Sequence, residues 1–292
     1  MTFNENANVG GSKARRRGAG IAVAGGGVAG LGVVVVLLLN LLTGGDLSGL
    51  LGDGTQVQTG GGSDEGAVEG CRTGADANRD DTCRLAATST MLDEYWGTYI
   101  KGYQDAGLVI VDGSTPTPCG TASNATGPFY CPGDATVYID PAFFSVLHQQ
   151  FGATSGNLAQ MYVLAHEYGH HVQDITGIMQ KYPNNGTGPA SNGVRTELQA
   201  DCFAGAWVQD AAGQKDAAGV AYIKEPTQAQ IDDALNAAAS VGDDHIQKEA
   251  TGRVNPESWT HGSSAQRVRW FTAGYRDGVN ACDTFSVAGG DL

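Results

Sequence analysis

The feature that most constrains this chain is a pair of histidines four residues apart, His166 and His170, with Glu167 directly after the first. Residues at positions i and i+4 of an α-helix lie on one face, so both imidazoles can reach a single Zn²⁺ ion. Glu167 then stands where a carboxylate can take a proton from a zinc-bound water as that water attacks a carbonyl carbon. The pattern therefore predicts a helix here and the chemistry of a zinc-dependent hydrolase.

The residues around this pair have the pattern of a buried helix. Apolar residues recur at helical spacing over 158–175, and Ser155 and Asn157 are both competent N-caps. Polar side chains in a buried helix need partners, and one metal ion satisfies both imidazoles at once. His171 lies about 100° round the helix from His170, so we expect it to make structural hydrogen bonds and not to bind the metal.

A third ligand is expected from a second helix, predicted from Arg195 to about Ala212. Its first turns contain Glu197 and Asp201, which are again four residues apart on one face. We expect Glu197 to be the third zinc ligand and Asp201 to accept a hydrogen bond from a ligating histidine. In one alternative, Asp201 is the direct zinc ligand and Glu197 supports it. In the other, both are solvated acids near a helix N-terminus. A metzincin arrangement is excluded, because glutamine and threonine stand three and six residues after His170.

Six cysteines all follow the apolar N-terminal segment, and an even number there indicates disulfides formed in an oxidising compartment. None has the CxxC spacing of a thiolate zinc site, so we do not assign them to the metal. The local spacing of the cysteines suggests two pairs, and the two cysteines that are then left over form the third pair. The expected disulfides are Cys71–Cys83, Cys119–Cys131 and Cys202–Cys282.

The formal net charge of −14 is distributed unevenly. Residues 1–42 hold four basic groups against one acidic group, whereas the remaining 250 residues hold 13 basic against 30 acidic groups. Neutralising phosphates requires a basic surface, which an acidic domain of this kind lacks. We therefore expect no nucleic-acid partner.

Composition divides the chain into four segments. Residues 1–18 are polar with a basic cluster, and we expect a disordered cytoplasmic tail. Residues 19–42 carry no charge and are long enough for one transmembrane helix, with the basic flank keeping the N-terminus inside; a cleaved signal peptide is the alternative. Residues 43–69 have the composition of a Gly-rich flexible linker. Residues 70–292 would then form an extracellular domain anchored to the cell membrane.

The domain is predicted to mix helices with short strands, giving an α+β fold that is mainly helical with a small sheet. The strand predicted at 136–140, just upstream of the helix with the two histidines, is either an exposed sheet edge that aligns a substrate backbone or an ordinary sheet strand, and the sequence pattern does not separate the two. The other predicted elements are a helix between Cys83 and Ala106, a strand at 108–111, an Ala-rich helix at 231–239 and a last helix capped by Ser263 or Ser264.

His261 lies at the entry to this last helix, where a side chain can project into a cleft. We expect it to donate a hydrogen bond to the oxyanion of a tetrahedral intermediate, with a purely structural hydrogen bond as the alternative. Arg267 is a weaker candidate for that task and is expected to be an ion-pair partner. The acidic pair Asp243 and Asp244 is interpreted as a solvated turn.

The stretches HEYGHHVQ from His166 and ELQADCFAGAW from Glu197 resemble zincin proteases that use glutamate as third ligand. More narrowly, the chain resembles the putative neutral zinc metallopeptidase family of bacterial membrane-anchored proteins. The similarity extends to residues 129–132, 137–140, 242–244 and 260–264. It implies a zincin-like fold and supports His166, His170 and Glu197 as ligands with Glu167 as the base.

We therefore expect a zinc endopeptidase that acts on peptide or protein substrates outside the cell membrane, with the zinc-bound water activated by Glu167. A non-catalytic zinc-stabilised extracellular scaffold or adhesion domain is the alternative. The presence of Glu167 favours the enzyme, because a scaffold has no need of a base. An amidase acting on cell-wall peptides would share the chemistry and differ in substrate.

Overall fold

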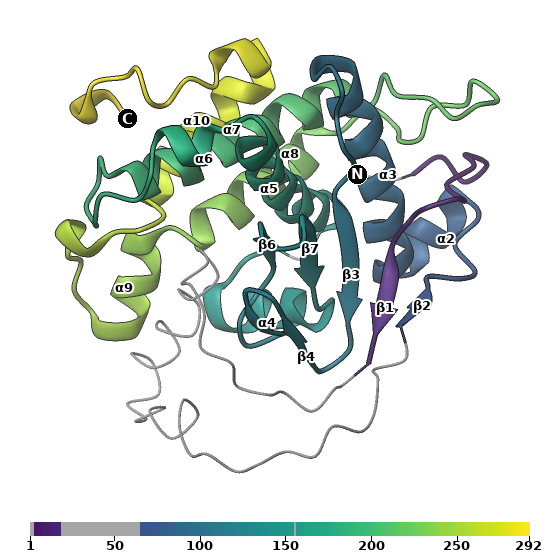
Figure 1. Cartoon of the computed structure of the whole chain (residues 1–292), viewed down its shortest axis with the longest axis horizontal. Helices are drawn as coiled ribbons and strands as arrows, with labels where there is room; N and C mark the ends of the chain where they lie inside the picture. Colours follow the sequence, from purple (N-terminus) through teal and green to yellow (C-terminus); the bar gives the residue numbers. More distant parts are fainter. Residues whose placement is uncertain (1–2, 19–64, 155) are drawn as a thin grey trace.

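A computed structural model describes residues 3–18, 65–154 and 156–292 of the chain. The fold is mixed α/β, mostly helical with a small sheet, as expected (Figure 1). The strands are β1 Arg15–Arg17, β2 Glu65–Ala67, β3 Gly107–Val111, β4 Ser114–Thr117, β5 Gly120–Ser123, β6 Phe129–Cys131 and β7 Thr136–Ile139. The helices are α2 Gly74–Arg79, α3 Asp81–Tyr99, α4 Ala142–Phe151, α5 Asn157–Ile175, α6 Ile178–Lys181, α7 Asn192–Ala211, α8 Gln228–Ser240, α9 Asp243–Thr251 and α10 Ser264–Asp277. Short 3₁₀ turns span Pro256–Ser258, Val279–Ala281 and Gly289–Asp291.

Five of these strands form one sheet in the order β2-β1-β3-β7-β6, with β1–β3 and β3–β7 parallel. Strands β3 and β7 are apolar and almost entirely buried, which suits the interior of a parallel arrangement. Because β7 pairs with β3 on one side and β6 on the other, the strand at 136–140 is an ordinary interior strand, and the alternative of an exposed edge is excluded for it. The edge on that side is β6.

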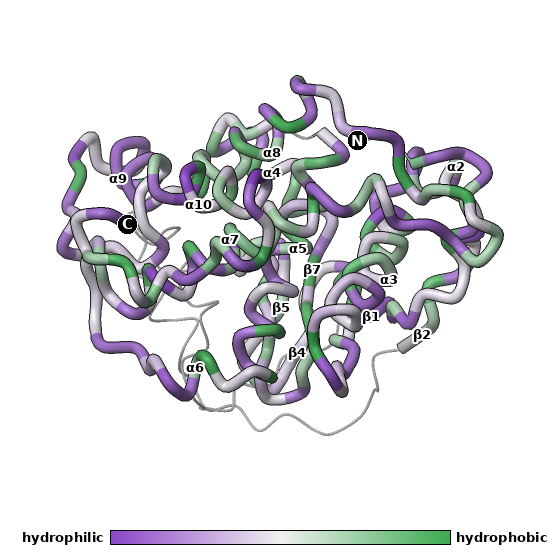
Figure 2. The backbone as a smooth tube through the Cα atoms, turned by 90° about the horizontal axis from the view of Figure 1, so that it is seen from above, coloured by the Kyte–Doolittle hydropathy of each residue, from purple (hydrophilic) through white to green (hydrophobic). Residues whose placement is uncertain are grey.

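Helices α5, α7 and α10 pack closely where glycine removes the side chain. A Cβ at Gly169 of α5 would lie 2.9 Å from the Cα of Ala200 in α7. A Cβ at Gly205 of α7 would meet the carbonyl oxygen of Phe271, in α10, at 2.1 Å. The first approach brings α7 against α5, and the second brings it against α10. Stretches of hydrophobic residues lie towards the centre beside β7, and hydrophilic residues lie along the periphery at α9 (Figure 2).

The helices predicted around residues 83–106, 158–175 and 195–212 are confirmed as α3, α5 and α7. The N-cap of α5 is Gly156, which makes no side-chain capping bond, so the expected cap at Asn157 is wrong; Ser155 lies outside the described residues. Ser263 caps α10 in a capping box with Gln266, as expected. All three expected disulfides are present.

The N-terminal residues differ from the separate tail that we expected. Phe3 and Ala7 are fully buried in the main hydrophobic core, and β1 is part of the sheet. Apolar side chains among the polar residues of 3–18 explain this, because burying them outweighs leaving the segment in solvent. The ordered structure also resumes before Gly70, since β2 occupies Glu65–Ala67 at the end of the predicted linker.

The predicted transmembrane segment, residues 19–42, and the linker up to residue 64 lie outside the described residues. Within the parts of the chain that the structure describes, no helix combines the length and the apolar character needed to cross a bilayer.

Candidate metal centre

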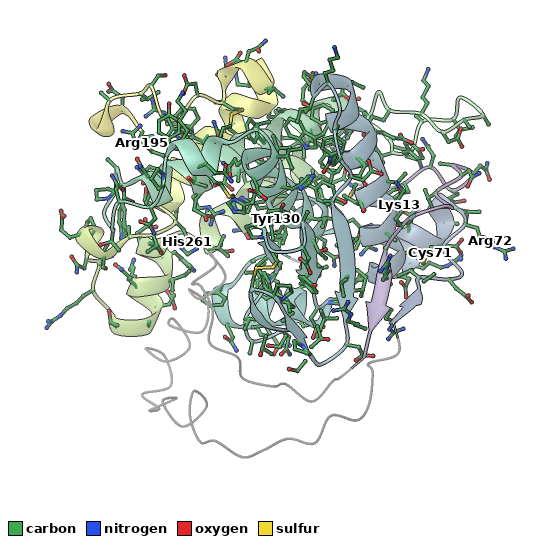
Figure 3. All side chains as sticks on the ribbon, viewed as in Figure 1. Lys13, Cys71, Arg72, Tyr130, Arg195 and His261 are labelled. Atoms are coloured by element: carbon green, nitrogen blue, oxygen red, sulfur yellow. A yellow bond between two sulfur atoms is a disulfide. The ribbon has the colours of Figure 1, made fainter. Side chains whose placement is uncertain are left out.

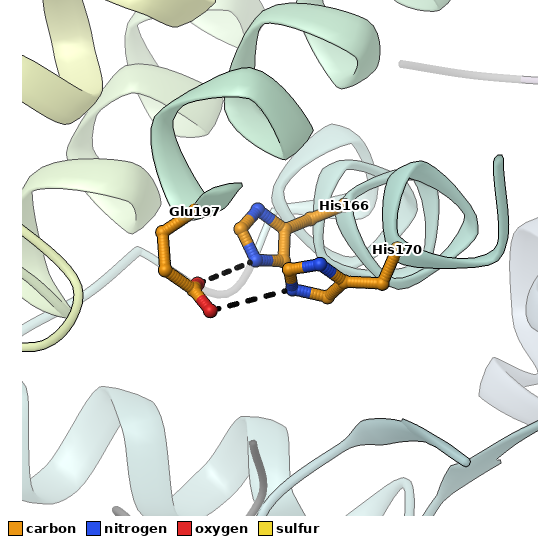
Figure 4. Close-up of side chains that lie close together, drawn as sticks. All are labelled: His166, His170 and Glu197. Carbon is orange, nitrogen blue, oxygen red and sulfur yellow. Dashed lines mark hydrogen bonds and ion pairs between the residues drawn. The ribbon is translucent and has the colours of Figure 1, made fainter. Parts of the chain in front are cut away.

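Three of the predicted site residues converge between α5 and α7. His166 and His170 project from one face of α5, and Glu197 reaches them from the second turn of α7 (Figure 4). The Nε2 atom of His166 lies 3.2 Å from Oε2 of Glu197, and Nε2 of His170 lies 3.5 Å from Oε1. All three side chains are buried, and their candidate ligand atoms lie within 4.8 Å of one another.

This geometry fits a zinc ion. Ligand atoms bound to Zn²⁺ at about 2.0–2.2 Å with tetrahedral angles stand about 3.3–3.6 Å apart, close to the two measured separations. Two imidazole nitrogens and one carboxylate are also the donor set of catalytic zinc sites that keep a fourth position open. Calcium and magnesium prefer an oxygen-only ligand set. The residues present therefore suit zinc.

The outer nitrogen of His166 is held by a buried ionic cluster. Its Nδ1 lies 2.9 Å from Oδ1 of Asp201, which also accepts a hydrogen bond from the Tyr162 hydroxyl at 2.5 Å. The Arg267 guanidinium donates to both carboxylate oxygens of Asp201, at 2.8 and 2.9 Å. Asp201 is fully buried, so the bidentate arginine supplies the counter-charge it needs. The predicted places of Asp201 and Arg267 agree with this arrangement.

The outer nitrogen of His170 is held by an amide instead. Nδ1 of His170 lies 2.9 Å from the side-chain oxygen of Gln173. The Gln173 amide nitrogen donates to the Thr196 carbonyl at 2.7 Å and to the Gln199 side-chain oxygen at 3.1 Å. Gln199 in turn donates to the carbonyl of Cys282, 2.8 Å away. Such outer contacts fix the ring orientation and tautomer of a ligand, leaving Nε2 for the metal.

Glu167 is buried beside the metal residues and is oriented by the sheet. Its Oε2 accepts a hydrogen bond of 2.9 Å from the backbone N–H of Tyr130 in β6. The Tyr130 hydroxyl donates to Asp174, seven residues further along α5, at 2.9 Å. Tyr130 thus joins β6 to α5 at two places; it is buried, and Figure 3 labels it near the centre of the view. His171 makes structural contacts only, including one of 2.7 Å to the Gln104 carbonyl, as expected.

His261 is held in place by the carboxylate of Asp243, which stands 18 residues earlier in the chain. Oδ2 of Asp243 accepts hydrogen bonds of 2.7–2.9 Å from the backbone N–H groups of Thr260, His261 and Gly262. Its other oxygen lies 3.4 Å from Nδ1 of His261. Asp243 is 4% exposed, so the interpretation of this acid as a solvated turn is wrong. It anchors the loop that carries His261.

The electrostatics of the cluster favour a bound cation. Burial opposes charge, but the Asp201 and Glu197 carboxylates prevail and raise the pKa of His166 to about 10. Burial likewise opposes ionisation of Glu197, yet His170 and His261 hold the pKa of its carboxyl well below the usual range. The pKa of His261 is raised in turn: burial opposes this, and Glu197 and Asp243 outweigh it. A zinc ion that takes His166 must therefore displace a proton from it.

Sequence reasoning missed four residues around the centre, namely Gln173, Gln199, Asp243 and the backbone of Tyr130. Gln173 carried a readable signal, because it stands three residues after His170 on the same helix and such residues are neighbours. The contacts of Gln199, Asp243 and Tyr130 join residues that are far apart in the chain, so no local sequence pattern indicates them.

Comparison with known proteins gives one family. The family model described as "Putative neutral zinc metallopeptidase" matches residues 3–285. The uncharacterized protein Rv2575 of Mycobacterium tuberculosis is 52% identical over 220 residues, 75% of each chain. The uncharacterized protein YpfJ of Escherichia coli K12 is 39% identical over 269 residues, 89% of this chain and 87% of its own length. No solved structure matches the chain.

Proposed function

Because this chain belongs to the neutral zinc metallopeptidase family, we propose that it hydrolyses peptide bonds, with His166, His170 and Glu197 as the ligands of its zinc ion. The observation that carries this proposal is the convergence of those three side chains beside a buried Glu167. The substrate would be a peptide or protein. Three disulfides support a location outside the cytoplasm, because such bonds persist in oxidising compartments.

Zinc bound here supplies a Lewis acid that polarises a carbonyl and makes water more acidic. Glu167 is the general base: it accepts the proton of the attacking water and returns it to the leaving amine. The Tyr130 N–H holds one oxygen of Glu167, which sets the direction in which the carboxylate faces the metal residues. Asp201 and Gln173 keep both histidines turned towards the metal.

His261 is the donor that stabilises the oxyanion formed during the attack. Its raised pKa favours the protonated ring, which is the stronger donor. Asp243 holds both the ring and its loop, so the donor is placed before substrate arrives. Asp243 and His261 then act as one unit, although 18 residues separate them in the chain.

The free edge of β6 is the proposed substrate-binding strand. The N–H of Tyr130 points from this edge towards Glu167, so the edge faces the catalytic carboxylate. An extended peptide that docks along β6 beside this contact would lie next to the metal residues. The Cys119–Cys131 disulfide and pairing with β7 hold this edge in place.

The test compares the wild-type protein with Glu167→Gln and with Glu249→Gln, a control at an exposed position. Zinc content is measured by mass spectrometry and cleavage is followed on an unfolded protein mixture. We expect all three proteins to carry one zinc and Glu167→Gln alone to lose activity, by on the order of 10³-fold or more. Bound zinc with no cleavage by the wild type would favour the scaffold, and equal cleavage by Glu167→Gln would refute the assigned base.

A further inference from the structure

The N-terminal arm, residues 3–17, is bound to the domain along most of its length. Phe3 is fully buried, and its backbone N–H and carbonyl both bond to the side chain of Asn78, at 2.9 and 3.0 Å. The N–H of Asn4 donates to the Tyr222 carbonyl at 2.9 Å. The N–H of Asn8 donates to the Asp216 carboxylate at 2.8 Å. These partners come from two separate parts of the domain, so the arm ties them together.

Gly74 makes room for the arm. A Cβ at this position would lie 1.9 Å from the backbone oxygen of Asn4 and 3.0 Å from the Cβ of Phe3. The N–H of Gly74 also donates to the carbonyl of Ala7 at 2.9 Å. The domain is thus shaped at the start of α2 to accept the arm backbone, and no larger residue at this position would allow the contact.

The arm ends by completing the sheet. Strand β1 adds in parallel to β3, with Arg15 opposite Val109 and Arg17 opposite Val111. On its other side β1 pairs with β2, and Arg17 stands opposite Glu65. The last residues before the undescribed stretch 19–64 and the first residue after it are therefore direct neighbours in one sheet.

The basic residues of the arm have acidic partners in the domain. Lys13 forms an ion pair with Asp105, and Arg16 forms one with Asp112 at 3.0 Å. The arm is the basic part of an otherwise acidic chain, so the two complement each other. The same basic cluster was the reason to expect the N-terminus on the cytoplasmic side, and these contacts supply a different reason for its presence. In the view of Figure 3, Lys13 lies to the right of Tyr130 and His261 lies to its left.

Partner residues in neighbouring strands lie about 5 Å apart, whereas the hydrocarbon core of a bilayer is about 30 Å thick. Arg17 and Glu65 are strand partners, so they cannot lie on opposite faces of a membrane. We propose that the N-terminal arm folds as the first strand of the peptidase domain, and that the N-terminus and the metal centre therefore face the same compartment. This inference stands apart from the proposed catalytic activity, because it rests on none of the metal-site residues.

The first test is the sidedness of the two ends in the full-length protein. Asn6→Cys and Gly290→Cys place single thiols at exposed positions, while the six native cysteines are in disulfides. Intact cells are treated with a membrane-impermeant maleimide, before and after permeabilisation. We expect both thiols to behave alike, with a labelling ratio near one in each condition. Labelling of Gly290→Cys in intact cells, with Asn6→Cys labelled only after permeabilisation, would overturn the proposal.

The second test measures docking itself, again in the full chain. A specific protease site is inserted at Gly61, within the undescribed stretch, and the protein is cleaved in mild detergent. We expect the N-terminal fragment to stay bound to the rest of the chain. Gly74→Ala should reduce the retained fraction by at least about tenfold, because the methyl group would overlap the backbone of Asn4. Gly97→Ala is the matched control, since a Cβ there meets nothing within 4 Å. Release of the fragment from the otherwise wild-type protein, or equal retention by Gly74→Ala, would refute docking.

Discussion

Gln173 offers the sharpest test of how the metal centre is held together. Its side-chain oxygen accepts from Nδ1 of His170, and its amide nitrogen donates to the Thr196 carbonyl and to Gln199. Gln173→Met keeps the length of the side chain and removes all three hydrogen bonds. The ring of His170 is then free to rotate and to change tautomer. We expect zinc to bind more weakly to this variant.

The expected loss follows from these contacts. Removing an outer hydrogen bond of a metal ligand typically lowers metal affinity about 10–100-fold, or about 1.4–2.7 kcal/mol. The metal-free protein should also lose stability, since His170 Nδ1 and the Thr196 carbonyl would each forgo a buried partner at about 1–3 kcal/mol. Gln173→Glu separates the two effects. It retains an acceptor for His170 but has no N–H to donate, so zinc affinity should recover while stability does not.

The assay titrates metal-free protein with zinc against a chromophoric chelator and follows unfolding of the same metal-free samples by urea. Gln180→Met is the control, because Gln180 is exposed and bonds only at the surface with Asp174. We expect it to stay within about 0.5 kcal/mol of the wild type. Zinc binding by Gln173→Met within twofold of the wild type would show that this amide does not orient His170.

Three further predictions follow from other parts of the structure. Asp243→Asn should lower turnover by on the order of 10² while zinc content is unchanged, measured by single-turnover cleavage, because the His261 ring loses the carboxylate that faces its Nδ1. Replacing Cys202 and Cys282 together with serine should lower the free energy of unfolding by about 4 kcal/mol, since the disulfide spans 80 residues; a midpoint in urea equal to that of the wild type would contradict this. Burial raises the pKa of the Asp93 carboxyl from 3.8 to about 7, so between these values the folded protein binds a proton that the unfolded chain has released. The stability that Asp93 contributes should therefore fall with rising pH through this window and level off above it, so the difference in melting temperature between the wild type and Asp93→Asn should change from pH 4 to 7 and stay constant above.

Local sequence patterns were sufficient to predict which side chains come together at the candidate metal centre. The two histidines and Glu167 lie within five residues of one helix, and Glu197 and Asp201 share one face of the next, so helical periodicity alone places each set. The disulfides followed from spacing and from the even number of cysteines. Within each helix the relevant geometry is set over a few turns of chain, whereas the Cys202–Cys282 pair was predicted only as the one left after the two local pairs.

Tertiary structure decided everything that depends on the path of the chain between elements. Asp243 anchors the His261 loop because α9 and the start of α10 meet in space, and nothing in the spacing of these residues fixes that meeting. The sheet edge is β6 and not β7 because a strand's neighbours depend on which other segments return beside it. The N-terminal arm is the clearest case. Its composition indicated a solvated basic tail, but Phe3 finds a buried site beside Gly74 and its basic residues find acidic partners, contacts made across more than 70 residues of sequence. Sequence alone thus predicted the residues of the candidate metal centre, while long-range packing determined which strand and which loop lie beside it and where the N-terminal arm packs.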